Sequence, residues 1–452
     1  MAAPATPEEI ITLAWIERGA NSFESSFIFG GSSTMSSIHE EINKIRIIDG
    51  HEHIDPMEIR KKNKVDFFGL LHYLDSDLIT AGMQRGILSE NSKLSVEEKA
   101  EQFLLYYQKT KNTTYARLLK TAVHDLFGMD DWSVNGILAL NEKVLAATND
   151  DTWYQRVLNE KSGIDLAITL PFTTNVDFSL FRPVMFLDYA FKLRTIKDVQ
   201  VIEGHTGENV QTFQDYLHAV DALLYKFVKE GMVAVKLGHA YWRTLKTMKP
   251  TFHEAEQCFN TLLSSIINEP ISQKELVVLQ DYLIHHIIQC SIKYELPIQI
   301  HTGHHETSVS GNGNIITNSK VTDLIPLLAA YPEADFVLLH CGIPYHQEYL
   351  SIVKNYPNVY ADFTWVYAIS PTIAKQILHQ MIEMVPQNKI FGFGGDYNFI
   401  EGTYAHQKLA RKIVGDVLVE KVQDQMLTEK EAVEFARRIF RENLIELYKL
   451  KV

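Results

Sequence analysis

Four apolar, strand-like runs of this chain each end on a histidine or an aspartate, and this repeated ending constrains the fold most strongly. The runs are 46–53, 297–301, 336–340 and 390–396. In the first run, His51 and His53 are two residues apart, so on an extended strand both imidazoles point the same way, about 6–7 Å apart. The carboxyl ends of the strands in a parallel barrel meet at one face. The pattern therefore predicts a metal site at the mouth of a parallel barrel.

The rest of the chain supplies the other elements that a closed barrel needs. Continuous apolar runs typical of strands covered on the outside by helices occur at 164–170, 182–188, 232–238 and 359–364. Helical periodicity is present at 253–268, 273–291, 321–331, 371–384 and 429–450. These elements predict the α/β class and a (β/α)8 TIM barrel.

One connection is far too long for an ordinary link between a strand and a helix. Residues 54–161 are rich in helix formers and aromatic side chains. We interpret them as a helical insertion after the first strand, placed to form a lid and a pocket wall. Residues 1–44 are predicted to be an N-terminal helical extension. Residues 45–452 then form a single barrel that includes the insertion, a length that one decorated barrel can occupy.

Composition excludes several kinds of partner. The chain has 43 Lys and Arg against 56 Asp and Glu, a formal charge of −13, which argues against nucleic acid because phosphate neutralisation needs a basic face. The 3 cysteines lack framework spacing, which favours a reducing compartment. No apolar run approaches the roughly 20 residues that span a bilayer, and the N-terminus lacks the pattern of a signal peptide. We expect a cytoplasmic protein with neither nucleic-acid nor membrane partners.

The strand-end residues suggest which cation would bind. His51, His53, His301 and Asp396 offer three imidazoles and one carboxylate, a set that suits Zn²⁺ best, with Mn²⁺ and Fe²⁺ as alternatives. A cation in such a site lowers the pKa of a bound water toward neutrality. Asp396 could contact both the metal and the water and carry the proton to a leaving group. The competing interpretation is a structural site, or histidines that only satisfy buried hydrogen bonds.

Two further residues leave alternatives open. His340 ends its strand and is predicted either to bind a second metal or to polarise a substrate carbonyl; a core histidine is the competing interpretation. Lys236 lies inside an apolar strand, where a lone ammonium is costly. It is either carboxylated to bridge two metals, or an amine paired with Asp396 or substrate, or part of a structural ion pair with Asp49 or Asp362. The number of ions, one or two, depends on this choice.

Four residues near the predicted mouth are candidates for contacting the substrate. Tyr241 and Arg243 follow the fourth strand, and a guanidinium can bind a carboxylate through two hydrogen bonds. His304 lies in the polar loop after the fifth strand, and Trp365, after the seventh, could stack on a ring. The alternatives are an ion pair for Arg243, a solvated loop position for His304 and a core role for Trp365.

With these residues assembled, the chain resembles the amidohydrolase superfamily, in the branch that contains uronate isomerases and family-2 amidohydrolases. The matching motifs are Ile48-Asp-Gly-His51-Glu-His53, Val235-Lys236-Leu237, Ile300-His301-Thr-Gly, Leu339-His340-Cys-Gly and Gly394-Gly-Asp396. The resemblance implies that His51, His53, His301 and Asp396 are metal ligands. It also implies that His340 contacts the substrate or a second metal, and that the insertion matches that of uronate isomerases.

Three functions are compatible with this pattern. The first is a metal-dependent hydrolase that attacks an amide, lactone or ester of a small polar substrate bearing a carboxylate. In that reaction His340 would stabilise the oxyanion and Asp396 would manage the proton. The second is an aldose–ketose isomerase acting on a uronic acid. The third is a catalytically silent metal-binding barrel. The predicted partner is a small-molecule substrate, and pairing into a homo-oligomer is common among such barrels.

Overall fold

The computed structural model describes residues 30–171, 173–264, 271–306 and 315–452. Its eight parallel strands pair in sequence order, from β1 to β8. Backbone hydrogen bonds from Gly50 to Phe393 (3.0 Å) and from Asp396 to His51 (2.9 Å) join the first strand to the chain after the last. The predicted TIM barrel is therefore confirmed. Its strands are β1 (Ile47–Glu52), β2 (Ile164–Thr169), β3 (Phe181–Phe186), β4 (Ala234–Leu237), β5 (Ile298–His301), β6 (Phe336–Leu339), β7 (Val359–Asp362) and β8 (Ile390–Phe391).

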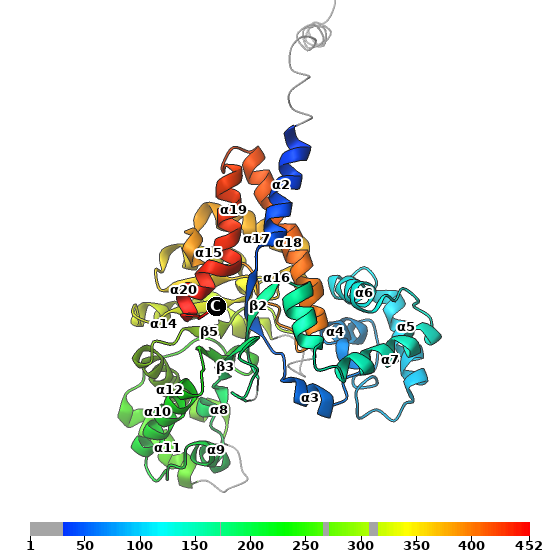
Figure 1. Ribbon diagram of the computed structural model, residues 1–452. Coiled ribbons are helices and arrows are strands. Elements are labelled where there is room, and N and C mark those ends of the chain that lie inside the picture. The colour runs from blue at the N-terminus through cyan, green and yellow to red at the C-terminus, as the bar shows by residue number, and fades with distance from the viewer. Residues whose placement is uncertain (1–29, 172, 265–270, 307–314) are drawn as a thin grey trace, which may run out of the picture.

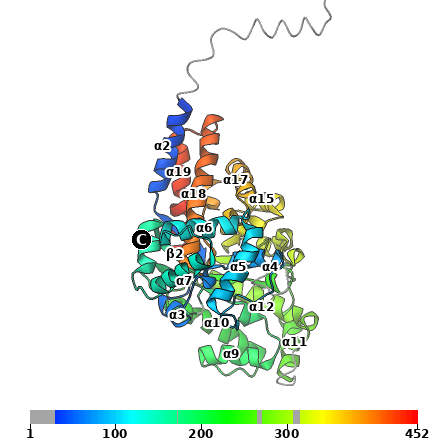
Figure 2. The same cartoon turned by 90° about the vertical axis from the view of Figure 1, so that its right-hand side faces the viewer.

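The long connection after β1 is helical, as predicted, and forms a separate lobe beside the barrel (Figure 1). N-terminal to the barrel, α2 (Gly30–Lys44) lies against α18, in agreement with the predicted extension (Figure 2). Residues 1–29 of that extension lie outside the described residues. The elements of the insertion are α3 (Met57–Lys62), η1 (Phe68–Leu70), α4 (Tyr73–Thr80), α5 (Val96–Thr110), α6 (Thr114–Phe127), α7 (Val134–Thr148) and η2 (Gln155–Lys161).

The remaining helices follow the later strands. The predicted helix over 429–450 is interrupted by one π-helical segment, and the segment at 321–331 begins as a 3-10 turn. Residues 265–268 of another predicted helix lie outside the described residues. The helices are α8 (Asp188–Phe191), α9 (Ile196–Thr206), α10 (Phe213–Lys229), η3 (His239–Tyr241), α11 (Phe252–Ser264), α12 (Gln273–Lys293), η4 (Ile316–Ser319), η5 (Val321–Leu324), α14 (Ile325–Ala330), η6 (His340–Gly342), α15 (His346–Asn355), α16 (Val366–Ile369), α17 (Pro371–Met384), η7 (Gln387–Lys389), α18 (Ile400–Gln423), α19 (Glu429–Arg437), η8 (Arg438–Glu442) and α20 (Asn443–Tyr448).

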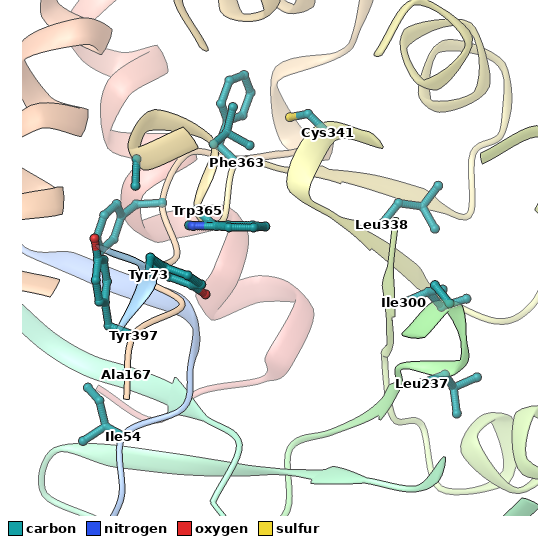
Figure 3. Close-up of a cluster of buried hydrophobic side chains, with 14 of the residues drawn as sticks. Ile54, Tyr73, Ala167, Leu237, Ile300, Leu338, Cys341, Phe363, Trp365 and Tyr397 are labelled. Carbon is teal, nitrogen blue, oxygen red and sulfur yellow. The ribbon is translucent and has the colours of Figure 1, made fainter. Parts of the chain in front are cut away.

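The barrel interior is layered, apolar at one end and polar at the other. Successive strand residues face opposite sides, so Leu237, Ile300 and Leu338 belong to the apolar core between the strands and the helices (Figure 3). A second apolar cluster, which includes Ile48 and Leu166 and is joined by Leu444 and Tyr448 of α20, fills another part of the barrel. Buried polar residues lie nearer the strand ends: Asp49, His51, Lys236, Gln299, His301 and Asp362. This polar layer is where the predicted site residues lie.

Two other expectations concern the whole chain. None of the helices in the described ranges is both long and apolar enough to cross a membrane. The three cysteines, Cys258, Cys290 and Cys341, are free thiols, as expected from spacing that does not suit a disulfide framework.

Candidate metal centre

The two histidines of the first strand face one carboxylate. His51 is fully buried, whereas the His53 side chain is 38% exposed. Their ring centroids are 5.1 Å apart. The Nε2 atoms of His51 and His53 lie 3.4 and 3.2 Å from Oδ1 of Asp396. Donor atoms from opposite ends of the chain therefore converge on one point.

Asp396 reaches this point because two glycines precede it. A Cβ atom at Gly394 would lie 1.9 Å from a neighbouring hydroxyl oxygen, and one at Gly395 would lie 1.8 Å from Oε1 of Glu52. Asp396 itself has a φ of 62°, a left-handed conformation that costs a non-glycine residue about 1–3 kcal/mol. Such strain persists only where the surroundings hold it. Here the Asp396 N–H donates to the carbonyl of His51.

This group has the chemistry of a divalent cation site. One ligand atom from each of His51, His53 and Asp396 fits within a mutual distance of 4.8 Å. Nε2 of His51 is buried and has no hydrogen-bond partner in the described part of the chain. Burial lowers the pKa of His51 well below its usual value, so its imidazole is neutral. Two nitrogens and one oxygen leave a coordination position open, as catalytic zinc sites do. These residues therefore fit a divalent metal.

The carboxylate is ionised, as a ligand must be. Burial alone raises the pKa of Asp396, but the hydrogen bond with His53 and the neighbouring imidazoles outweigh burial and hold that pKa well below its usual range. Metal ligands must lose their protons before they bind. Metal binding at neutral pH would therefore release no proton from Asp396.

His301 lies beside the three-residue group but not within it. Nδ1 of His301 is 3.0 Å from the Tyr241 hydroxyl, and its Nε2 is 2.9 Å from the carbonyl oxygen of His304. Both ring nitrogens therefore have hydrogen-bond partners within the protein. Binding a metal through either nitrogen requires that one of these contacts opens, and the role of His301 as a ligand stays a prediction.

His340 is placed at the same face and is neutral. Its ring centroid is 4.5 Å from that of His301, and burial lowers its pKa to about 4. Nδ1 lies 3.0 Å from the carbonyl oxygen of Thr364, and this contact is a hydrogen bond only if Nδ1 carries the proton and donates it. In this tautomer Nε2 has a lone pair that can bind a metal or accept a hydrogen bond. An oxyanion-stabilising role would need the other tautomer or a protonated ring.

Known proteins are similar to this chain in sequence and in fold. Residues 269–450, which carry His301, His340 and Asp396, match the family model described as amidohydrolase. A uronate isomerase from Rhizorhabdus wittichii is 22% identical over 434 residues, covering 88% of this chain and 91% of that protein. The crystal structure of glucuronate isomerase from Caulobacter crescentus superposes with a TM-score of 0.77 at 18% identity, covering 95% of this chain and 98% of that chain. Residues 269–450 are therefore similar to amidohydrolases, and the described chain has the fold of the glucuronate isomerase.

A third relative is matched over a shorter stretch. The protein fluG from Emericella nidulans is 33% identical over 157 residues. That match covers 34% of this chain and 17% of the fungal protein. The similarity therefore concerns one part of each protein.

Lys236 lies in the polar layer of the barrel. Its side chain is buried, and burial lowers its pKa to about 8 even though Asp396, Asp362 and Asp188 attract its positive charge. Pairing of the Lys236 amine with Asp396, or with Asp49 or Asp362, stays a prediction. Carboxylation and a bridge between two metals stay predictions.

Tyr73 was not among the residues predicted from the sequence. Its hydroxyl donates to Oδ2 of Asp396 at 2.7 Å and lies 2.6 Å from the main-chain oxygen of the same residue. Tyr73 begins α4 of the insertion, so the insertion contributes directly to the candidate metal centre. No local pattern marks this tyrosine, because its partner is 323 residues away in sequence.

Gln299 was also missed, although the sequence carried a signal. It is a polar residue within an apolar strand, two positions before His301 and on the same face. Its Oε1 lies 2.8 Å from Nδ1 of His51, while its Nε2 donates to the carbonyl of Gly50 and the hydroxyl of Tyr448. The side chain therefore fixes the ring of His51 with Nε2 facing the site.

We expect Gln299→Leu to weaken metal binding by about 10- to 100-fold, because supporting partners of metal-bound histidines have effects of this size. Competition with a chelator measures the affinity. Gln299→Glu keeps a hydrogen-bond acceptor for His51 and should retain more of the metal affinity than Gln299→Leu does. Exposed Gln423→Leu is the matched control. An unchanged affinity in Gln299→Leu would contradict the supporting role.

Aromatic side chains and one carboxylate hold the insertion against the barrel. The rings of Trp365 and Tyr73 stack with centroids 4.7 Å apart (Figure 3). The ring of Tyr115 also stacks with that of Tyr73, with centroids 5.3 Å apart. Glu306, after β5, is hydrogen-bonded with Tyr115 at 2.8 Å and His304 at 3.1 Å. The insertion thus forms a wall of the site. Trp365 is buried, so its indole packs within this wall.

Arg243 has partners within the protein instead of an open guanidinium. It is buried and forms an ion pair with Asp281 at 2.6 Å. Its guanidinium also donates to the carbonyl of Lys246. A contact with a substrate carboxylate would have to compete with these bonds and stays a prediction. Tyr241, by contrast, lies at the site through its contact with His301.

Proposed function

We propose that this chain is a metal-dependent aldose–ketose isomerase acting on a sugar acid. The observation that carries the proposal is the alignment with a uronate isomerase over 88% of this chain and 91% of that protein. The glucuronate isomerase structure superposes over 95% of this chain and 98% of its own, with a TM-score of 0.77, which supports a shared fold. This choice reverses the first hypothesis from the sequence, which was a hydrolase.

The residues divide the chemistry between them. His51, His53 and Asp396 would hold the cation, and their donor set suits Zn²⁺. When bound, a divalent cation supplies a Lewis acid that holds sugar oxygens and polarises a carbonyl. Asp396 can accept and return a substrate proton at Oδ2, where the Tyr73 hydroxyl orients it. The stacked Trp365 and Tyr73 rings exclude water from that side.

A metal-dependent hydrolase is the second candidate, since the family model that matches residues 269–450 is described as amidohydrolase. In that reaction Asp396 would remove the proton of an attacking water and pass it to the leaving group. The substrate would be a small polar amide, lactone or ester.

A paired substrate screen of the metal-loaded protein tests the proposal. We expect conversion of glucuronate or galacturonate, followed as loss of the aldehyde, and no turnover after chelation. Hydrolysis of acyl-amino acids or sugar lactones without uronate conversion would overturn the isomerase in favour of the hydrolase. Bound metal with neither activity would favour a silent barrel.

A further inference from the structure

A cavity lies on the side of the molecule where α18 packs against both α2 and α6 (Figures 1 and 2). Its volume is about 1240 Å³, and the segment between η2 and β2 forms another part of its wall. None of the three proposed metal ligands lines it. A space of this size accommodates a small metabolite.

The cavity is basic although the chain is acidic overall. Seven lysine and arginine side chains line it, with Glu160 as the one lining carboxylate among the described residues. Four of the seven have carboxylate partners, as in the pair Arg46–Asp165. Within the described ranges, Arg117, Lys161 and Arg411 have no ion pair. The chain as a whole has a formal net charge of −13, so this concentration of positive charge is local.

Arg411 is the strongest sign that an anion belongs here. It is only 6% exposed. Its guanidinium donates to neutral groups alone: Oε1 of Gln407 at 2.8 Å and the carbonyls of Ile42, Ile45 and Ser162 at 2.6, 2.9 and 3.3 Å. Burial, with Arg46 nearby, lowers its pKa to about 10. Leaving a buried cation without a counter-charge is costly, and a bound anion would offset that cost.

We propose that this cavity binds a phosphate-bearing small molecule. Arg117 and Lys161 are exposed and available to contact its oxygens, and Arg411 supplies the buried charge. Thr114, Ser370 and Thr372 also line the cavity, and a hydroxyl group is a neutral donor. Arginine and hydroxyl donors are the groups that recognise phosphate. The net negative charge of the chain disfavours nucleic acid as the occupant.

Calorimetric titration of the metal-loaded protein with inorganic pyrophosphate tests the proposal. We expect one site per chain and at least a tenfold loss of affinity in the double variant Arg117→Gln/Lys161→Gln. These side chains are exposed, so the thermal midpoint should be unchanged. The matched control, Lys197→Gln/Lys274→Gln, removes the same charge at other exposed positions and should bind as the parent does.

Pyrophosphate can also bind a metal ion, so Asp396→Asn is titrated in parallel. Binding that persists in Asp396→Asn and is weakened by Arg117→Gln/Lys161→Gln supports the cavity. The proposal would be overturned if the parent did not bind pyrophosphate, or if the double variant bound it as tightly as the parent. It would also be overturned if the control variant lost as much affinity as the double variant. Citrate binding as tightly as pyrophosphate would overturn the assignment to phosphate.

Discussion

Asp396→Asn should lower turnover by roughly a hundred- to ten-thousandfold, the range expected when a proton-transfer group is removed. The change keeps the shape of the side chain but removes the negative charge that faces His51 and His53 at 3.4 and 3.2 Å. It also replaces the ionised acceptor of the Tyr73 hydroxyl. Steady-state kinetics and metal content by mass spectrometry, measured on the same preparations, check the prediction.

Excess metal separates the two roles of this carboxylate. If the loss comes only from weaker coordination, saturating metal restores turnover. If Asp396 also moves the proton, turnover stays low when the site is full, and this is the outcome we expect. Exposed Asp424→Asn is the control and should behave as the parent does. Unchanged turnover in Asp396→Asn would exclude the proposed proton route.

The barrel and the position of its site could be predicted because their signals are local. Each predicted strand overlaps an observed one, since a continuous apolar run between turn signals is typical of a strand buried on both faces. The eighth is the shortest, because β8 covers only Ile390–Phe391 of the predicted 390–396. His51, His53 and Asp396 are at strand ends, and the topology of a parallel barrel brings such ends together. The order of the strands is enough to predict that these three residues lie close together.

The detailed contacts could not be predicted, because they depend on partners distant in sequence. His301 is at its predicted place, yet its hydrogen bonds with Tyr241 and with the carbonyl of His304 depend on loop geometry. Arg243 is similar: only the folded chain brings Asp281 to its guanidinium. Tyr73 has no periodicity or spacing that marks it. The amphipathic tail at 429–450 was predicted as one helix, but periodicity alone does not reveal the π-helical segment within it.

A buried ion pair fastens the start of the insertion to the helix that follows Asp396. Arg60 of α3 donates to both carboxylate oxygens of Glu401 in α18, at 3.0 and 2.7 Å. The indole of Trp153 donates to the same carboxylate at 2.7 Å. The Arg60 and Glu401 side chains are 3% and 0% exposed. Removing one member of such a pair leaves the other charge buried and alone.

We therefore expect Glu401→Ala to reduce the free energy of unfolding by about 3–5 kcal/mol, the usual cost of breaking a buried pair. Urea unfolding followed by circular dichroism measures the change. Arg60→Met/Glu401→Leu removes both charges and should recover most of the loss, since apolar replacements of similar volume are often neutral. Glu434→Ala, an exposed change, serves as the control. If Glu401→Ala were as stable as the parent, or the double variant less stable than the single one, the pair would not fasten the insertion as its contacts indicate.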